Sequence, residues 1–252
     1  MTSVAEALSC QDVQVRYGEF RAIDGVSIDF APGVISSVIG PNGAGKTTLI
    51  NVLSGRQVPQ TGRVHFGKRD ITGMTAHQRA RLGVGRSFQI TKIFPEMTVM
   101  ENLRLAAQAR TFHFQPFWRP AAGYAALNEV VEEVLDEVGL QHLRDHLADT
   151  LSHGDQRALE MGITLAPRPS VLLLDEPLAG VGEKEIDRTI SLIERAARGR
   201  TVVLVEHNIS AVMALSQHVV VMTQGKVLVA GPPEQVRRDK AVRRAYLGDE
   251  DA

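Results

Sequence analysis

Residues 40–47 read Gly40-Pro41-Asn42-Gly43-Ala44-Gly45-Lys46-Thr47, which matches the pattern G-x-x-x-x-G-K-[ST]. An apolar run at residues 34–39 precedes them, and helical spacing of apolar residues follows at residues 47–53. In that setting the glycines let successive backbone N–H groups converge on a phosphate, and the helix N-terminus adds a favourable dipole. The segment therefore predicts a phosphate-binding loop. The flanking strand and helix weigh against a glycine-rich turn that matches by chance.

Two side chains of this loop suit a nucleoside triphosphate. We expect Lys46 to reach the β- and γ-phosphates and the hydroxyl of Thr47 to ligate Mg²⁺. The backbone from residue 40 onward, together with Thr48, is expected to line the ATP site.

A second segment supplies the carboxylates that such a site needs. The apolar run at residues 171–174 ends in Asp175 and Glu176. Asp175 is interpreted as the Mg²⁺ partner, through water, and Glu176 as the general base that polarises the attacking water. On its own, this segment fits an ordinary strand and turn equally well. Downstream of a phosphate-binding loop, the functional interpretation is favoured.

Composition narrows the class of protein. The 252 residues are 44% hydrophobic, which is ordinary for a packed core, and 28 Lys and Arg balance 29 Asp and Glu to a net charge of -1. No basic block stands out, so nucleic acid is not expected as the main partner. Cys10 is the one cysteine, which excludes an intrachain disulfide and favours a reducing compartment. We interpret it as a small apolar residue near the first strand.

No part of the chain is expected to cross a membrane. Uninterrupted apolar stretches such as residues 171–174 and 219–222 are far shorter than the roughly 20 residues that a membrane span needs. Residues 1–7 contain Glu6 but no Lys or Arg, and no long apolar region follows, so they do not resemble a secretory signal. We therefore expect a cytoplasmic location.

Apolar patterning divides the chain into three kinds of segment. Residues 8–66 are mostly strand, with alternation as at Val26, Ile28 and Phe30 and turns at glycines. Residues 97–165 turn helical. One face of that helical stretch recurs at spacings of three and four, and Gly139 fits its end; the face consists of Leu127, Val130, Val131, Val134, Leu135 and Val138.

Beyond residue 170, strands and helices alternate. Apolar runs at residues 171–174, 202–205 and 219–222 are separated by helical patterns at residues 186–197 and 209–216. This alternation predicts parallel βαβ units, whose strands are buried on both faces. We infer one catalytic α/β core with a β-rich N-terminal portion and a helical insertion.

Five further motifs follow the order known for ATP-binding-cassette (ABC) ATPases, and the resemblance covers nearly the whole chain. Taken singly, each is ordinary: a strand aromatic, a solvated glutamine or a helix cap. Their joint order favours the family. The motifs are Tyr17 in Val15-Arg16-Tyr17-Gly18, Gln89 in Arg86-Ser87-Phe88-Gln89, the segment Leu151-Ser152-His153-Gly154-Asp155-Gln156, the loop at residues 178–182, and His207 in Val205-Glu206-His207-Asn208.

The resemblance implies a role for each of these residues. Tyr17 would stack on adenine, and Gln89 would contact the metal and the lytic water and sense the membrane subunit. Ser152 and Gly154, in the family's signature segment, would bind the γ-phosphate of ATP held by the opposite subunit. His207 would contact the γ-phosphate.

Two positions depart from the family pattern. His153 stands where the first signature glycine is usual, although Ser152 remains before a helix expected to start near Gln156, which is an anion-binding arrangement. Residues 178–182 occupy the place of the dimer-contact loop, where Gly182 replaces a common aspartate. The absence of a carboxylate at this position bears on how the two ATP sites communicate across a dimer.

The resemblance also implies a fold and partners. The fold is a P-loop NTPase ABC cassette with a RecA-like parallel-sheet core, an N-terminal antiparallel β subdomain and an α-helical insertion. Residues 1–252 would form a single nucleotide-binding domain, with its core at about 1–90 and 166–252 and its insertion at about 91–165. Two subunits, identical or paralogous, would sandwich two ATP molecules with Mg²⁺ and drive integral membrane permeases, served indirectly by a solute-binding protein. The subunit would lie on the inner face of the cell membrane.

Several segments resemble one branch of the family, the ATPases of branched-chain amino acid and urea importers; these segments are residues 85–89, 94–103, 153–157, 205–208 and 244–248. An ATPase of urea or amide import and a lipopolysaccharide-exporter ATPase stay open as alternatives. Non-transport ABC ATPases of DNA repair or translation, which form a different class of alternative, usually carry two cassettes or a long coiled-coil insertion, and this sequence shows neither. The aromatic residues at 112–118 are interpreted as packing of the helical insertion, with a partner-facing loop as the alternative.

Overall fold

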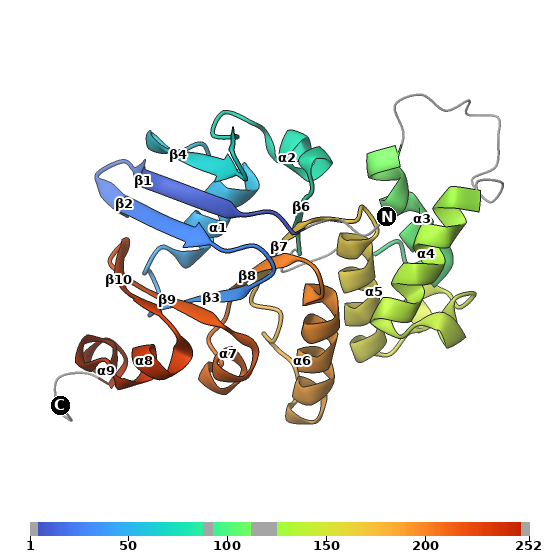
Figure 1. The fold of residues 1–252 in the computed structure, drawn as a ribbon. Coiled ribbons are helices and arrows are strands. Elements are labelled where there is room, and N and C mark those ends of the chain that lie inside the picture. The colour runs from blue at the N-terminus through green and yellow to red at the C-terminus, as the bar shows by residue number, and fades with distance from the viewer. Residues whose placement is uncertain (1–4, 88–92, 112–124, 248–252) are drawn as a thin grey trace.

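The computed structural model describes residues 5–87, 93–111 and 125–247. Two β-sheets lie on either side of one helix, and a group of helices lies at one end of the molecule (Figure 1). This architecture confirms the expected fold class. No helix within the described ranges is long and apolar enough to span a bilayer.

The first sheet is antiparallel and has the strand order β2-β1-β4-β5. It is built from β1 (Leu8–Tyr17), β2 (Phe20–Phe30), β4 (Thr61–Phe66) and β5 (Arg69–Asp70). The alternation that predicted β2 is real, because Val26, Ile28 and Phe30 are buried while the residues between them are exposed. One face of this sheet therefore covers a core.

The second sheet has the order β10-β9-β3-β8-β7-β6. Its strands are β3 (Ile35–Ile39), β6 (Val84–Arg86), β7 (Val171–Asp175), β8 (Thr201–Val205), β9 (His218–Thr223) and β10 (Lys226–Gly231). Neighbouring strands from β9 to β6 pair in parallel, and β10 is an antiparallel edge. Every residue of β3, β7 and β8 is buried, as their continuous apolar runs predicted.

Helix α1 (Lys46–Ser54) lies between the two sheets, where Leu49, Ile50 and Leu53 share a core with residues of both. The other helices of this part are α2 (Ala76–Leu82), α6 (Glu183–Ala197), α7 (Ile209–Leu215), α8 (Pro233–Arg238) and α9 (Lys240–Leu247). The helix that follows the phosphate-binding loop is thus held at the centre of the molecule.

Arg79 of α2 fixes the C-terminal end of α1. It is fully buried, and its guanidinium donates to the carbonyls of Val52 (2.7 Å) and Leu53 (2.8 Å). It also donates to Thr72 (3.0 Å) and Met74 (3.2 Å) in the loop before α2. The last carbonyls of a helix have no partner within the helix, so Arg79 satisfies two of them. Burial lowers the pKa of Arg79 to about 10, which leaves it charged at neutral pH.

The helical group consists of α3 (Val99–Thr111), α4 (Ala125–Val138) and α5 (His153–Leu165), with short 3-10 turns η2 (Gln141–Leu143) and η3 (Ala148–Thr150). Figure 1 shows it at the right of the sheets. The predicted apolar face of α4 is buried, with Val130 only partly so, and Gly139 ends the helix with φ 76°. Residues of α5 and α6 join the same core, which ties this group to the second sheet.

One helix boundary was predicted wrongly. The helix of the signature segment begins at His153, not near Gln156. The cause is Ser152, whose hydroxyl accepts the N–H of Asp155 (3.2 Å) and so caps the helix three residues earlier.

Candidate functional site

The phosphate-binding loop leaves β3 and enters α1 through close backbone contacts. A Cβ on Gly40 would lie 2.2 Å from the carbonyl oxygen of Met222, and one on Gly45 would lie 2.4 Å from that of Ala22. Gly45 also has φ 100° at the N-cap of α1. Only glycine fits at these two positions, so the loop has the shape of an anion cradle above the helix N-terminus.

Lys46 lies inside this loop and is 6% exposed. Its ammonium donates to the carbonyl oxygens of Gly40 (2.8 Å) and Pro41 (3.0 Å). Burial lowers its pKa, and the charges of Glu176 and Asp175 oppose that shift. A partly desolvated cation is thus placed where phosphate oxygens would meet the loop.

Asp175 ends β7 and is buried with an arginine that sequence reasoning missed. The guanidinium of Arg86, on β6, donates to Oδ2 of Asp175 (3.0 Å), to Oδ1 of Asn51 (2.8 Å) and to Oγ of Ser54 (2.9 Å). Burial raises the pKa of Asp175, while Arg86 lowers it. This network ties α1, β6 and β7 together beneath the site.

The oxygens present fit a magnesium ion held mainly by a nucleotide. Thr47 is exposed at the first turn of α1, and Asp175 supplies one carboxylate. The described residues contain no group of three or more His, Cys, Asp or Glu that could hold a metal. Mg²⁺ in nucleotide sites takes one or two carboxylates plus substrate phosphates, so this sparse set agrees with that mode.

Glu176 and His207 meet at the same edge of the sheet. Nε2 of His207 lies 2.8 Å from Oε1 of Glu176. Glu176 has φ 52°, a left-handed conformation that is uncommon for a residue with a side chain, and its N–H donates to the carbonyl of Val205 (2.9 Å). β8 lies between β3 and β7, so its end brings His207 between the phosphate-binding loop and the carboxylates.

These parts line one hollow of about 210 Å³. Its walls are the phosphate-binding loop, Glu176, His207 and two exposed aromatic residues at the rim, Tyr17 and Phe20. Tyr17 was predicted from the sequence and Phe20 was not. The ring of Phe20 lies next to the β1–β2 turn and is 61% exposed. The structure therefore brings together the loop, the predicted adenine contact and three of the four predicted catalytic side chains, Lys46, Glu176 and His207.

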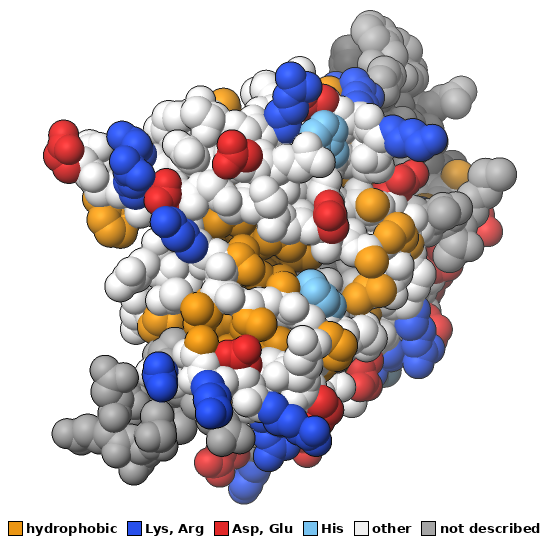
Figure 2. All heavy atoms as spheres, turned by 60° about the vertical axis from the view of Figure 1, so that its left-hand side comes forward, with side chains coloured by type: hydrophobic (Ala, Val, Ile, Leu, Met, Phe, Trp, Pro, Cys, Tyr) orange, Lys and Arg blue, Asp and Glu red, His pale blue; other side chains and the backbone are white. Residues whose placement is uncertain are grey.

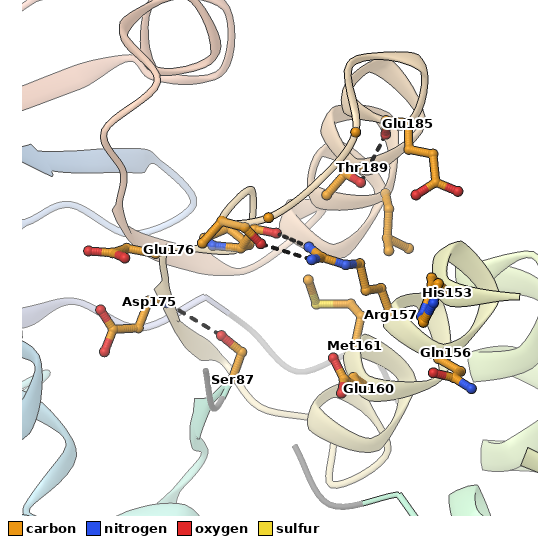
Figure 3. A pocket seen from close by; sticks show the side chains of 15 residues that line it. Ser87, His153, Gln156, Arg157, Glu160, Met161, Asp175, Glu176, Glu185 and Thr189 are labelled. Carbon is orange, nitrogen blue, oxygen red and sulfur yellow. Dashed lines mark hydrogen bonds between the residues drawn. The ribbon is translucent and has the colours of Figure 1, made fainter. Parts of the chain in front are cut away.

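The signature residues are placed elsewhere. Ser152 and Gly154 lie at the N-terminus of α5 and do not line the hollow around Lys46. A larger cleft of about 520 Å³ separates α5 from α6 and the end of β7 (Figure 3). His153 lines this cleft together with Asp175 and Glu176.

Arg157 crosses that cleft. Its guanidinium donates to the carbonyls of Pro177 (2.9 Å) and Ala179 (2.8 Å), as the dashed lines in Figure 3 show. From the other side, the buried carboxylate of Glu206 accepts the N–H of Leu178 (2.7 Å). The loop after Glu176 is thus held between α5 and the end of β8.

Three predicted features cannot be placed. Gln89, the aromatic segment at residues 112–118 and Gly248 lie outside the described residues, so their roles stay predictions.

On the face that Figure 2 shows, Lys and Arg side chains are interspersed with Asp and Glu around a central apolar region.

A glycine loop between a parallel strand and a helix, with a carboxylate-tipped strand two places along the sheet, defines a P-loop nucleoside triphosphatase. Comparison with known proteins narrows this class: the model of the ABC transporter family matches residues 23–179, and that of the branched-chain amino acid ATP-binding cassette transporter matches residues 226–252. The chain belongs to the ABC transporter family, as an ATP-binding and ATP-hydrolysing subunit.

Individual relatives are similar in sequence to this chain over nearly its full length. The high-affinity branched-chain amino acid transport ATP-binding protein BraF of Pseudomonas aeruginosa is 39% identical, with 96% of this chain and 98% of BraF covered. The lipopolysaccharide export system ATP-binding protein LptB of Acidithiobacillus ferridurans is 34% identical, with 98% and 99% covered. A crystal structure of a nucleotide-free ATP-binding cassette from an ABC transporter has a TM-score of 0.82 at 31% identity, covering 97% of this chain and all of that one.

Proposed function

We propose that this subunit drives a membrane importer for branched-chain or other hydrophobic amino acids. The observation that carries the proposal is the match of residues 226–252 to the branched-chain family model, which lies outside the part common to ABC transporters. The similarity to BraF supports it. An ATPase for urea or amides is the nearest alternative, and the similarity to LptB keeps a lipopolysaccharide exporter as a second one.

We assign binding of the triphosphate to the loop at residues 40–48. Backbone N–H groups and the ammonium of Lys46 would hold the β- and γ-phosphates, and Tyr17 would stack on adenine. The hydroxyl of Thr47, the carboxylate of Asp175 and Gln89 are the proposed contacts to Mg²⁺. When bound with the nucleotide, Mg²⁺ neutralises negative charge on the phosphate oxygens. Arg86 opposes the effect of burial on the pKa of Asp175, favours its ionised form and fixes its orientation.

Glu176 is the proposed general base. Its backbone is left-handed, and one oxygen of its carboxylate meets Nε2 of His207. The other oxygen can accept a proton from a water that attacks the γ-phosphate. His207 would also contact the γ-phosphate and so couple base and substrate.

We propose that residues 1–252 act as one nucleotide-binding domain, with the core at about 1–90 and 166–252 and the helical insertion at about 91–165. Ser152 and Gly154 would serve the ATP of a second ATPase subunit, identical or paralogous, because they lie away from the hollow around Lys46. The partners would be integral permeases and, indirectly, a solute-binding protein. The subunit would be cytoplasmic and peripheral on the inner face of the membrane.

The transported solute is tested on the complex reconstituted with its permeases and binding protein. We expect leucine, isoleucine or valine to stimulate ATP hydrolysis, because a liganded binding protein favours the state in which the ATPase subunits close. Urea, amides, sugars and lipopolysaccharide serve as comparison solutes. Stimulation by lipopolysaccharide or sugar, but by no amino acid or amide, would reject the importer assignment and leave the ATPase assignment intact.

A further inference from the structure

The hydroxyl of the signature serine is already engaged in this chain. Oγ of Ser152 donates to Oδ2 of Asp155 at 2.6 Å while it accepts the N–H of the same residue. Asp155 lies in the first turn of α5, where the helix dipole favours an anion. A carboxylate therefore occupies the position beside the hydroxyl that we assign to the γ-phosphate.

Arg188 of α6 binds the second oxygen of this carboxylate, Oδ1 of Asp155. Partial burial opposes ionisation, but the hydrogen bonds from Ser152 and Arg188 hold the pKa of Asp155 below its usual value. Asp155 is thus charged at neutral pH, and each of its two oxygens has a partner.

The glycine of the signature segment makes room for this arginine. A Cβ on Gly154 would lie 2.9 Å from Nη1 of Arg188 and 2.9 Å from Oε1 of Glu185. The guanidinium therefore packs directly against the first turn of α5. Glu185 adds a second negative charge there, so Arg188 is the cation that offsets the local acidity.

A phosphate that approaches Ser152 would meet an ionised carboxylate at hydrogen-bond range, and like charges this close repel strongly when partly removed from water. We propose that Arg188 is a positioning residue, which neutralises Asp155 so that Ser152 can transfer its hydrogen bond from Asp155 to the γ-phosphate of the opposite subunit's ATP. The inference rests on the proposed shared site. It connects α6, which follows the dimer-contact loop, to the phosphate contact of α5.

A double-mutant cycle tests the inference in full-length protein that carries Glu176→Gln. The readout is the ATP concentration for half-maximal dimerisation, measured by light scattering. We expect Arg188→Gln to raise this concentration about tenfold, since one unopposed charge close to the phosphate is introduced. Asp155→Gln should change it less than about twofold, and adding Asp155→Gln to Arg188→Gln should restore the parent value. Arg188→Lys, which keeps the charge, should stay close to the parent.

Arg144→Gln is the matched control, because Arg144 also pairs with a carboxylate, Glu132, but outside the proposed site. Its dimerisation should equal that of the parent. No shift in Arg188→Gln, or the same shift whether residue 155 is Asp or Gln, would overturn the inference alone. ATP-dependent dimerisation that survives Ser152→Arg, or is absent from the parent, would instead reject the shared site and this inference with it.

Discussion

At the scale of single residues, the site combines one strained backbone position with one imidazole contact. A positive φ at a residue with a side chain costs free energy and persists where the surroundings enforce it, which is common at functional sites. At Glu176 the enforcing contacts are the hydrogen bonds to the carbonyl of Val205 and to Nε2 of His207. The carboxylate is therefore oriented before any substrate arrives.

Glu176→Gln should keep ATP affinity while turnover falls about 10²- to 10⁴-fold, because the amide preserves shape but cannot take a proton. Single-turnover hydrolysis and equilibrium nucleotide binding on the same preparation separate these effects. Lys46→Ala is the contrasting variant and should lose affinity itself, since a charge paired to phosphate is removed. Hydrolysis at the parent rate in Glu176→Gln would reject Glu176 as the base.

At the scale of secondary-structure elements, the loop after Glu176 connects two parts of the molecule. Arg157 on α5 holds its carbonyls, and Glu206 at the end of β8 holds an N–H. Motion of α5 relative to the second sheet must therefore displace the loop that directly follows the proposed base.

Arg157→Met should lower the rate of hydrolysis about tenfold, about 1.4 kcal/mol, with ATP affinity nearly unchanged, because the base loses its support while the phosphate-binding loop does not. Arg195→Met is the matched control, since Arg195 donates to the carbonyl of Glu137 away from the site (2.9 Å). The check is kcat and KM for both variants with melting temperatures alongside. Equal loss of kcat in both would show a general loss of stability instead.

Some helices and strands were predicted from the sequence, and others were not. Long apolar runs and the glycine loop predicted β3, α1, β7 and β8, together with Asp175 and Glu176 at a shared edge. The elements α2, β6, β10, α8 and α9 were not predicted, because few of their described side chains are buried and little apolar periodicity marks them in the sequence.

The missed site residues depend on contacts distant in sequence. Arg86 meets Asp175 89 residues later, and Arg188 meets Asp155 across a separation of 33. No local pattern marks an arginine as the partner of a particular carboxylate, so these contacts required the structure.

At the scale of the whole molecule, one core unites the two sheets. Residues of β1, β2, α1, β7 and β8 belong to a single cluster that includes Cys10. The antiparallel sheet should therefore unfold together with the parallel one.

Cys10 reports on this cooperativity. Burial raises its pKa to about 12, so the folded chain keeps a neutral thiol and should not react with a thiol reagent at pH 8. In a urea titration, the labelling of Cys10 should have the same midpoint as the loss of the circular dichroism signal. Because the folded pKa is raised, stability should be intact below the ordinary thiol pKa and fall as pH rises from there toward about 12. Labelling well before the spectroscopic transition would show that the antiparallel sheet opens separately.

The shared site is also a property of the assembly. Ser152→Arg chains and Lys46→Ala chains should each be inactive, whereas their mixture should recover ATP hydrolysis, because one mixed dimer contains one intact site. The measurement is ATPase activity of covalently linked dimers of each composition. Full activity of Ser152→Arg alone would show that the signature segment is not part of the site.

The hydrogen bonds from Arg79 to α1 indicate which part of the molecule stays fixed while ATP is bound and hydrolysed. Two hydrogen bonds from one buried side chain hold the far end of α1, and two more tie that side chain to the loop before α2, so a load applied at the phosphate end of α1 is resisted along the helix axis. Mechanical work requires a stationary frame against which other pieces move. With α1 fastened between both sheets, that frame is the pair of sheets, and the moving part is expected among the segments outside it, such as α5 across the cleft in Figure 3.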